Sequence, residues 1–338
     1  MTPEEKLELI KRNTLEVVQE DELLQLIKEK EHPVAYIGYA PTGQLHIGHF
    51  FPLMKVKDFI EAGFKFTFLI ADLHAFLDDM KCPWNLLQHR TEYYKKATMA
   101  MLKAVGVDTT NITFVQGSTF QLKKEYQLDT LHLCGEVTVN RSKRAASEVV
   151  RFKEDPKLGG FVYPLMQILD PIYLNADVSY GGVDQRGIYM LGRELLPKLK
   201  GRTLLSVFTP LLPGLSGGKM SASDASSKIG ILESEEEVLK KAKKAFCEEG
   251  VVEENGVLVF FKHVLFPLKK ETITIERPEK FGGNLTYDSY EALEKDFAEK
   301  KLHPMDLKAC LAKEVNILLQ PVRKAFEGSD VVKKAYPE

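Results

Sequence analysis

The chain has 338 residues and a nearly balanced charge, and these properties already exclude several classes of protein. Apolar residues make up 44% and charged residues 28%, which is typical of a folded globular protein and excludes a fibrous or disordered one. The 46 basic and 48 acidic residues give a net charge of −2, so the bulk charge indicates neither a nucleic-acid nor a membrane partner. The length predicts about two domains.

The four cysteines lie far apart without a CxxC pair, which argues against a zinc site or a disulfide framework. The N-terminus is acidic where a signal peptide would be basic, and the longest apolar runs are too short to span a membrane. We therefore expect a cytoplasmic protein without a metal site or a membrane association.

The N-terminal residues predict a helical arm. Thr2 can cap a helix that begins at Pro3, and apolar residues then recur at Leu7, Ile10, Leu15 and Val18. The next elements are a strand over 34–39, a loop at 41–43 and a helix over about 47–62. Further strands are expected at 66–71, 112–116, 176–180 and 204–209. Strands that alternate with helices predict an α/β domain with a Rossmann-type, doubly wound parallel sheet over residues 1–225.

Residues 226–338 have a different pattern, which predicts a second, mostly helical domain. Long, charged, helix-periodic segments cover 233–247, 287–300 and 304–326, with short apolar interruptions at 257–261 and 272–275. The last residues, 328–338, are expected to be a fraying tail.

A histidine pair stands between the first strand and the first helix of the predicted sheet domain, in the sequence Pro-Thr-Gly-Gln-Leu-His-Ile-Gly-His-Phe at 41–50. Ligands of open α/β sheets bind at the carboxyl ends of strands, where helix N-termini offer N–H groups to anions. His46 and His49 share one face of that first turn, and Gly48 leaves room for a flat ring. Two ordinary surface histidines in a capped turn are the alternative.

A glycine- and serine-rich loop follows the last predicted strand of the sheet domain, with Gly217 and Gly218 before Lys219. The glycines predict mobility, and the lysine ammonium can deliver a point charge to a phosphate. Taken alone, the pattern fits any flexible loop.

Together these two segments resemble the HIGH and KMSKS signatures of the class I aminoacyl-tRNA synthetases. The chain resembles the archaeal and eukaryotic tyrosyl-tRNA synthetases in particular, from the N-terminal arm to about Phe326. The further matching segments are Tyr36-Ile37-Gly38, Ala71 to Ala75, Tyr163 to Gln167 with Asp170, Gly181 to Arg186 and Lys280 to Asn284. The resemblance implies a tyrosine-tRNA ligase, which activates L-tyrosine with ATP to tyrosyl-adenylate and transfers tyrosine to the 3′ end of tRNA(Tyr).

The implied reaction starts from a carboxylate that is already ionised at pH 7, so it needs alignment and charge stabilisation rather than a protein nucleophile or base. The resemblance assigns catalysis to His46, His49, Lys219, Ser221 and Ser223. It assigns ATP, a substrate carried with Mg²⁺ and not a tightly bound cofactor, to Gly38, Gly48, Gly182, Asp184, Lys219 and Met220. Many family members have a second lysine where this chain has Ala222. Lys228, an arginine or a bound monovalent cation are candidates to replace that charge.

A tyrosine-specific pocket must hydrogen-bond the phenol oxygen and leave its partners unpaired when phenylalanine enters. The resemblance implies Tyr36 and Asp170 for this role, and Tyr163, Gln167 and Gln185 for the ammonium and carboxylate of the amino acid. Tyr163, Gln167 and Asp170 also fall on one helical face. His74 is either part of this pocket or a core histidine, and Tyr36 alone would equally fit a core position.

The expected tRNA contacts lie in both domains. The family has a dimer-interface insertion corresponding to about 120–160, next to the acceptor stem, which makes Arg141, Lys143, Arg144 and Arg186 candidates there. An exposed helix face with ordinary charges is the alternative. Phe281, His303 and Asp306 match anticodon-reading positions, where an aromatic ring stacks on a base and a carboxylate accepts from a guanine. Asp306 could instead serve only the dipole of its helix.

The family implies a homodimer, and the chain is expected to lack the appended C-terminal domain of some eukaryotic relatives. The nearest alternative is a tryptophanyl-tRNA synthetase, against which Tyr36 and Asp170 argue. A catalytically silent tRNA-binding protein on the same scaffold is disfavoured because the signature residues are present. A small-molecule nucleotidyltransferase would lack the features between Phe281 and Asp306.

Overall fold

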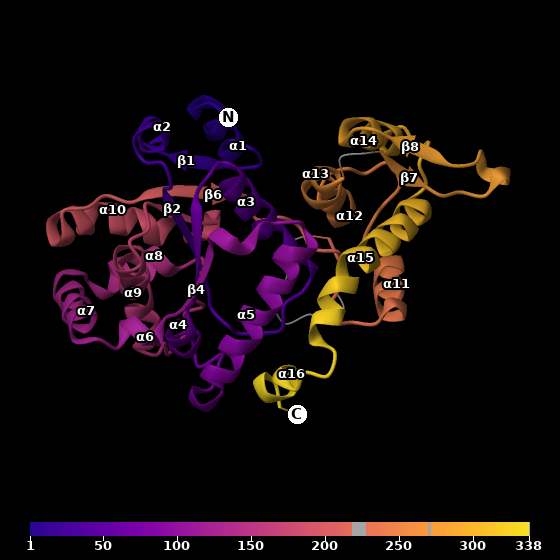
Figure 1. Ribbon diagram of the computed structural model, residues 1–338. Coiled ribbons are helices and arrows are strands. Elements are labelled where there is room, and N and C mark those ends of the chain that lie inside the picture. Colours follow the sequence, from indigo (N-terminus) through magenta and orange to yellow (C-terminus); the bar gives the residue numbers. More distant parts are fainter. Residues whose placement is uncertain (218–227, 270–271, 338) are drawn as a thin grey trace.

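The computed structural model describes residues 1–217, 228–269 and 272–337, and it shows a sheet-containing part joined to a helical part (Figure 1). The six-stranded sheet has the order β1-β6-β5-β2-β3-β4. Five strands are parallel and β1 is antiparallel to β6. The strands are β1 (Glu16–Val18), β2 (Val34–Tyr39), β3 (Lys65–Ile70), β4 (Ile112–Gln116), β5 (Val178–Gly182) and β6 (Leu205–Thr209). The predicted doubly wound α/β fold is confirmed.

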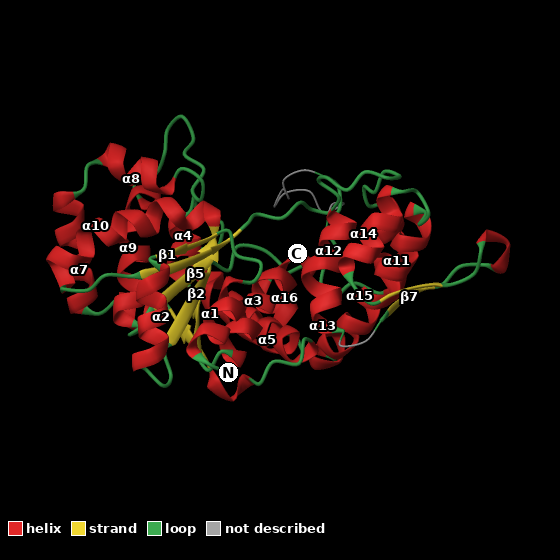
Figure 2. Ribbon diagram, turned by 90° about the horizontal axis from the view of Figure 1, so that it is seen from above, coloured by secondary structure: helices red, strands yellow, loops and turns green. Residues whose placement is uncertain are grey.

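Helices lie on both faces of this sheet (Figure 2). They are α3 (Phe50–Glu61), α4 (Asp72–Leu77), α5 (Leu87–Ala104), α6 (Ser118–Gln121), α7 (Lys124–Glu136), α8 (Val139–Ala146), α9 (Gly159–Tyr173) and α10 (Arg186–Lys200). The chain runs from β2 outward through β3 to β4, and then returns to the other side of β2 as β5 and β6. The gap between β2 and β5 is therefore the topological switch point, where ligands of such sheets bind.

The N-terminal arm is helical only in part. The α1 helix (Pro3–Lys11) begins with the predicted Thr2 cap, and α2 covers Glu20–Glu29. Between them Asn13 has a positive φ of 57°, which ends the helical path. The prediction that Leu15 and Val18 continue the first helix is wrong, because residues 16–18 pair with β6 instead. A sheet edge that offers unpaired backbone groups can capture a short segment regardless of its helical period.

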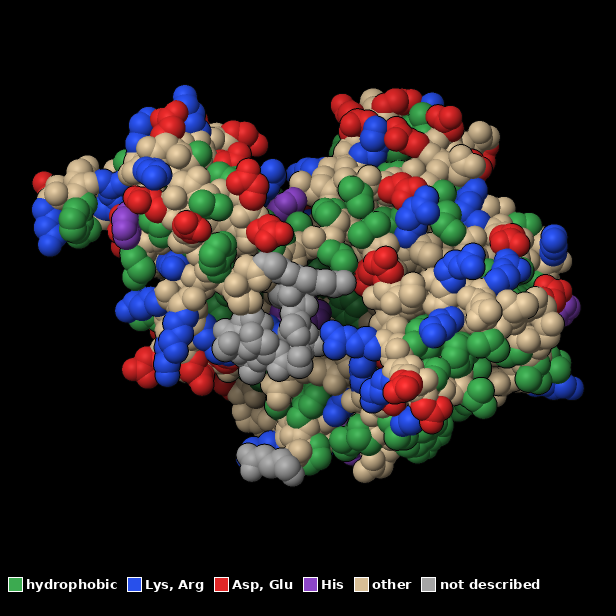
Figure 3. Space-filling view, turned by 180° about the vertical axis from the view of Figure 1, so that it is seen from behind, with side chains coloured by type: hydrophobic (Ala, Val, Ile, Leu, Met, Phe, Trp, Pro, Cys, Tyr) green, Lys and Arg blue, Asp and Glu red, His purple; other side chains and the backbone are tan. Residues whose placement is uncertain are grey.

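The helical part contains α11 (Glu235–Lys244), α12 (Gly256–Phe260), α13 (Phe266–Leu268), α14 (Tyr290–Ala298) and α15 (Pro304–Phe326), with a hairpin of β7 (Ile273–Ile275) and β8 (Leu285–Tyr287). The predicted α15 bounds are confirmed, whereas 257–261 is helical and Tyr287 belongs to a strand. Acidic and basic side chains are interspersed on the face shown in Figure 3, in agreement with the small net charge.

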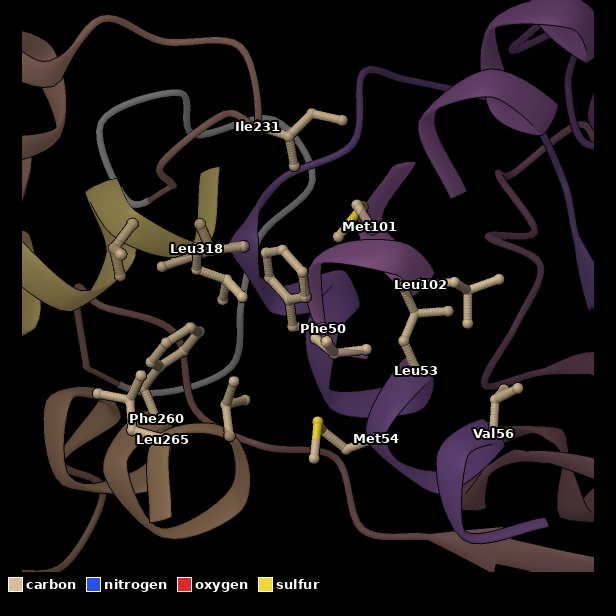
Figure 4. Close-up of a cluster of buried hydrophobic side chains, with 14 of the residues drawn as sticks. Phe50, Leu53, Met54, Val56, Met101, Leu102, Ile231, Phe260, Leu265 and Leu318 are labelled. Carbon is tan, nitrogen blue, oxygen red and sulfur yellow. The ribbon is translucent and has the colours of Figure 1, made fainter. Parts of the chain in front are cut away.

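One continuous hydrophobic core joins the two parts. In Figure 4, Phe50 of α3 lies between Met101 of α5 and the side chains of Phe260 and Leu318 from the helical part, and Leu53 lies next to Leu102 of α5. Phe50 is fully buried. The turn formed by His46 to His49, here called the histidine turn, directly precedes α3. The packing of α3 therefore fixes the position and direction of this turn.

The C-terminal segment is docked, so the prediction of a fraying tail is wrong. The α16 helix (Val331–Ala335) packs on α5. The guanidinium of Arg90 donates to the carbonyl of Ala335 at 3.2 Å and lies 4.6 Å from the ring centroid of Tyr336. That ring also contacts Tyr93 edge to face. Val331 and Ala335, one turn apart on α16, are also buried. This apolar face covers a single turn of a five-residue helix, which is too short to be recognised as a helical period in the sequence.

We predict that Tyr336→Ala lowers the free energy of unfolding by about 1–3 kcal/mol, because it removes a partly buried ring and its cation–π contact. Urea denaturation of the variant and of wild type measures this difference. Lys333→Ala, an exposed position on the same helix, is the matched control and should change stability by less than about 0.5 kcal/mol. Equal stability of the Tyr336 variant and wild type would show that the docking contributes nothing.

Candidate functional site

A cavity of about 540 Å³ lies at the carboxyl ends of β2 and β5, the switch point of the sheet. Its walls include most of the residues predicted for tyrosine and ATP. The predicted residues that line it are Tyr36, Gly38, Gly48, His49, His74, Tyr163, Gln167, Asp170, Gly182, Asp184 and Gln185. The structure thus brings together residues of β2, the turn before α3, α4, α9, the end of β5 and the turn that follows it. These residues are up to about 150 positions apart in the sequence.

Asp170, on α9, is the buried acid of this cavity, with 1% of its surface exposed. Its Oδ1 accepts hydrogen bonds from Gln121 Nε2 at 2.7 Å and from the Tyr126 hydroxyl at 2.8 Å. Its Oδ2 lies 3.7 Å from His74 Nε2 and accepts no hydrogen bond from the described residues. One oxygen is therefore held in place while the other can accept a donor from a ligand.

Aromatic side chains surround this acid. The Tyr36 and Tyr189 hydroxyls share a hydrogen bond of 2.6 Å, and both rings are buried. The ring of Tyr163 packs edge to face on His74 with 4.6 Å between the centroids. Aromatic rings, two tyrosine hydroxyls and a carboxylate thus line this part of the cavity, which suits an aromatic ring that carries a hydroxyl.

Two polar side chains of the cavity have a buried atom without a hydrogen-bond partner. Gln167 Nε2 donates to Gln185 Oε1 at 2.9 Å, whereas the buried Gln167 Oε1 is left without a partner among the described residues. His74 Nε2 is likewise buried and unpaired. Buried polar atoms are nearly always hydrogen-bonded in proteins, so these two atoms point to a polar ligand in the cavity.

Burial shifts the protonation of these groups. Loss of solvation raises the pKa of Asp170 to about 7, although hydrogen bonds from Gln121 and Tyr126 oppose the rise. The same loss of solvation lowers the pKa of His74 to about 4. At pH 7 the imidazole of His74 is therefore neutral, and Asp170 is close to half ionised.

The histidine pair lies where the sequence predicts. Residues 47–49 form a 3₁₀ turn capped by His46, whose Nδ1 accepts from Gly48 N at 3.2 Å. The two rings lie edge to face with 4.3 Å between their centroids. Burial lowers the pKa of His46 to about 2 and that of His49 to about 4. Both imidazoles are therefore neutral at pH 7, and they offer N–H donors rather than positive charge.

The loop before the histidines is held by α5. Arg90, which is buried, donates to the carbonyls of Pro41 and Thr42 at 3.4 and 2.9 Å. The Tyr94 hydroxyl donates to the Gly43 carbonyl at 2.7 Å, and the Tyr93 hydroxyl accepts from Leu45 N at 3.0 Å. Because Arg90 also binds the C-terminal segment, this loop and the docked tail share one anchor.

The predicted ATP residues line the cavity as far as the structure describes them. Gly38, Gly48, Gly182 and Asp184 are on its wall. A Cβ atom at Gly182 would come within 2.5 Å of Asp184 Oδ1, so glycine keeps that carboxylate where it is. The predictions for Lys219, Met220, Ser221 and Ser223, and the departure at Ala222, lie outside the described residues.

The predicted acceptor-stem residues lie on α8 and at the start of α10. Arg141 pairs with Glu194 at 2.7 Å, and Arg186 binds both carboxylate oxygens of Glu16 at 2.6 and 2.9 Å. The Lys143 ammonium lies 5.8 Å from the centroid of a phenylalanine ring, and Arg144 is exposed. The structure does not gather these four cations into the cavity.

The predicted anticodon residues lie in the helical part, away from the cavity. The Phe281 ring is 59% exposed. His303 caps α15 by accepting from Met305 N at 3.1 Å, and Asp306 follows in the first turn, 3.9 Å from Arg277 Nε. The helical part thus has an exposed aromatic ring at Phe281 and a partly buried carboxylate at the start of α15.

Sequence reasoning missed three side chains that surround Tyr36 and Asp170. They are Gln121 on α6, Tyr126 on α7 and Tyr189 on α10. Tyr189 stands four residues after Gln185, a spacing that places both on one helix face and could have revealed it. Tyr126 follows a run of charged residues, and nothing in its sequence neighbourhood distinguishes it from a surface tyrosine.

Two further searches cover the described residues only. No group of three or more histidine, cysteine, aspartate or glutamate side chains among them is placed to hold a metal ion. Within the same part of the chain, no helix has the length and apolar character needed to cross a membrane. All four cysteines are free.

The relationships of the chain agree with this site. Residues 28–320 match the family described as tRNA synthetases class I (W and Y). The chain is 51% identical to a tyrosine-tRNA ligase of Haloarcula marismortui, over 100% of this chain and 99% of the relative. It is 48% identical to a cytoplasmic tyrosine-tRNA ligase of Xenopus tropicalis, over 100% of this chain and 64% of that longer protein.

A solved structure is also similar. The tyrosyl-tRNA synthetase of Archaeoglobus fulgidus, determined with L-tyrosine, is 44% identical and superimposes with a TM-score of 0.88, over 96% of this chain and 99% of that one. The chain therefore belongs to the class I tRNA synthetases and, within them, to the tyrosine-tRNA ligases.

We predict that Asp170→Asn stabilises the protein at pH 8. The folded state of wild type holds this carboxyl with a pKa of about 7, above its value of 3.8 in the unfolded chain. The folded state thus binds the proton more tightly, and wild type loses stability as the pH rises from about 4 to about 7. An asparagine carries no charge, and its amide can face the unpaired His74 Nε2.

Urea denaturation at pH 5 and at pH 8 measures this effect. The stability difference between the variant and wild type should grow by about 2–3 kcal/mol from pH 5 to pH 8. Asp184→Asn, in the same cavity but only partly buried, is the matched control and should show a smaller change. A difference that stays constant with pH would contradict the raised pKa.

Proposed function

We infer that this chain catalyses the two steps of tyrosine-tRNA ligation, as its class and its relatives indicate. The carboxylate of L-tyrosine attacks the α-phosphate of ATP and forms tyrosyl-adenylate, and the tyrosyl group then passes to a ribose hydroxyl at the 3′ end of tRNA(Tyr). The observation that carries this proposal is the buried polar set of Asp170, Tyr36 and His74 at one end of a cavity whose other wall bears the histidine turn.

Asp170 and Tyr36 select tyrosine in this proposal. The phenol donates its proton to Asp170 Oδ2, the oxygen that accepts no hydrogen bond from the described residues, and accepts from the Tyr36 hydroxyl. A phenylalanine ring would leave both groups buried and unsatisfied. Tyr163, Gln167 and Gln185 hold the ammonium and carboxylate, which satisfies the unpaired Gln167 Oε1.

ATP occupies the part of the cavity between the histidine turn and β5. Asp184 accepts from the ribose hydroxyls, while Gly38, Gly48 and Gly182 let the nucleotide approach the backbone. The neutral imidazoles of His46 and His49 donate to phosphate oxygens as charge moves onto the leaving pyrophosphate. We propose that Mg²⁺ arrives as part of this substrate, since phosphate oxygens are its usual ligands. From the family resemblance, we propose that Lys219, Ser221 and Ser223 take part in catalysis. Lys219 and Met220 bind ATP in the same proposal.

Anticodon recognition belongs to the helical part in this proposal. The exposed Phe281 ring stacks on a splayed-out base, and Asp306 accepts from a guanine edge with His303 beside it. Arg141, Lys143, Arg144 and Arg186 contact the acceptor stem on the other part. Residues 1–225 would then be the catalytic domain and residues 226–338 the anticodon-binding domain, although one core runs through both.

We also propose that the protein is a cytoplasmic homodimer. Five large apolar side chains between residues 122 and 158 are 54–82% exposed, and these are Leu122, Leu128, Leu131, Val139 and Leu158. Large exposed apolar side chains that recur in one stretch of the chain support a protein interface in this proposal. They lie in the segment that the resemblance identifies as the dimer-interface insertion.

Pyrophosphate exchange into ATP tests the activation step without tRNA. We expect exchange with tyrosine, none with tryptophan, and exchange with phenylalanine lower by the order known for tyrosyl enzymes of this class, about 10⁵ in kcat/KM. Asp170→Ala should weaken the exchange with tyrosine at least about 100-fold. Strong exchange with tryptophan would show that tryptophan is the substrate. A folded protein without any exchange would refute the proposed activation step.

The variant Phe281→Ala tests the tRNA contact separately from the activation of tyrosine. We expect aminoacylation of tRNA(Tyr) to lose about 1–3 kcal/mol of stacking, a roughly 5- to 150-fold fall in kcat/KM for tRNA. Pyrophosphate exchange should stay unchanged, because this ring lies far from the cavity lining. Leu239→Ala, which removes another exposed apolar side chain of the helical part, is the control. Equal aminoacylation by the Phe281 variant and wild type would remove this residue from the tRNA interface.

A further inference from the structure

The helical part contributes two residues to the wall of the main cavity. His263 and Pro267 line it together with residues of the sheet part. His263 belongs to a π-helical turn over Phe261–Leu265, which joins α12 to α13. Neither residue has a role in the function proposed above, so the cavity extends beyond the groups that hold tyrosine, the ribose and the phosphates there.

The turn that carries His263 has an unusual backbone. It is the one π-helical segment within the residues that the structure describes. Such turns are rare in proteins and frequently lie at functional sites. Pro267 has no N–H, so the His263 carbonyl lacks the hydrogen bond that residue 267 would donate in an α-helix. The proline thus favours an irregular turn at the histidine.

This segment is held against both the loop after β6 and α3. A Cβ atom at Gly256 would overlap the backbone carbonyl of Gly214, so the start of α12 touches that loop directly. Phe51 of α3 packs edge to face on Phe260, the last residue of α12, with 5.7 Å between the ring centroids. The position of His263 relative to the sheet part is therefore set by a backbone contact and by ring packing.

The imidazole of His263 is half-buried and packs on Phe51. The two rings lie edge to face with 6.4 Å between their centroids. Neither ring nitrogen makes a hydrogen bond within the described part of the chain. The neighbouring Lys262 has a different environment, since its ammonium lies 5.1 Å from the ring centroid of Tyr290. Burial lowers the pKa of His263 to about 4, so at pH 7 the neutral ring offers one donor and one acceptor.

The two segments that contact α12, which are α3 and the loop after β6, add apolar side chains to the cavity wall. These are Phe51, Pro52, Leu211 and Leu212. A Cβ atom at Gly182 would lie 3.2 Å from Leu211 Cδ2, so this loop borders the wall where Asp184 is proposed to hold the ribose. Phe51 stands two residues after His49, at the proposed phosphate site. An adenine base has apolar faces and a polar edge, and it needs apolar walls with a few hydrogen-bonding groups.

We propose that His263 is a nucleotide-binding residue of the activation step, whose imidazole hydrogen-bonds the polar edge of the adenine base. The neutral ring can accept from the 6-amino group or donate to a ring nitrogen of adenine. The inference rests on the proposed function and adds to it a residue from the part of the chain otherwise assigned to the anticodon. Binding of ATP then depends on both parts of the molecule.

Pyrophosphate exchange with tyrosine at varied ATP concentration tests this role, on wild type and on His263→Phe, His263→Gln and Lys262→Ala. The phenylalanine variant keeps an aromatic ring beside Phe51 but has no hydrogen-bonding atom. We expect it to raise the KM for ATP about 3- to 10-fold at unchanged kcat, the effect of one lost hydrogen bond. His263→Gln keeps a donor and an acceptor and should recover much of this loss. Lys262→Ala changes the adjacent, exposed residue and should match wild type.

Tyrosine binding by equilibrium dialysis separates nucleotide binding from folding. The tyrosine Kd should be unchanged in His263→Phe, because Asp170 and Tyr36 hold that substrate in the proposed function. His263→Ala, which removes the ring, should raise the KM for ATP at least as much and gives the same comparison if the phenylalanine variant does not fold. A wild-type KM for ATP in both variants, a glutamine variant as weak as the phenylalanine variant, or an equal loss in Lys262→Ala would each overturn the proposal. An inactive wild type would instead refute the proposed function, so the two failures are distinct.

Discussion

The burial of α3 between the sheet and the helical part is the constraint on which the site depends. Phe50 follows His49 directly and is packed by both parts of the molecule. Truncation of such a buried ring costs about 3–5 kcal/mol, so the turn cannot shift without a large loss of packing. The loop before it is held by Arg90 and the chain after residue 228 is paired to it. The backbone N–H groups of this turn are therefore positioned by the packing of α3 rather than by the histidines themselves.

Burial stabilises the turn before α3, but it destabilises the pocket around Asp170, because polar groups are costly to bury. Asp170 is held by two donors on one oxygen, and its pKa is nevertheless raised to about 7. His74 remains neutral and partly unpaired. Such groups reduce the stability of the free protein, and a ligand that hydrogen-bonds them recovers part of that cost. In the proposed function, the groups that select tyrosine are therefore also groups that lower the stability of the free protein.

The sheet was predicted from local patterns in the sequence, and most residues of the cavity were predicted from the resemblance to a known family. Strand and helix periods located β2 and α3. The position of His46 and His49 between these two elements indicated a ligand site, and the family resemblance indicated Asp170. The failures share a different cause. Strand β1 forms because the edge of β6 offers unpaired backbone groups. Tyr336 docks because it contacts Arg90 on α5. Both features therefore depend on partners that are distant in the sequence. Tyr126 was missed for the same reason.

The docked C-terminus also imposes an order on the synthesis of the protein. Arg90 and Tyr93 emerge from the ribosome about 240 residues before Tyr336, which covers them. At about 5–20 residues per second, this surface of α5 stays incomplete for roughly 10–50 seconds. During that time the sheet can assemble while the loop carrying Pro41 and Thr42 keeps an arginine anchor that lacks its last partner. Until residues 331–336 are released, the nascent chain therefore leaves the Tyr93 ring and the Arg90 guanidinium without the Tyr336 ring that contacts both.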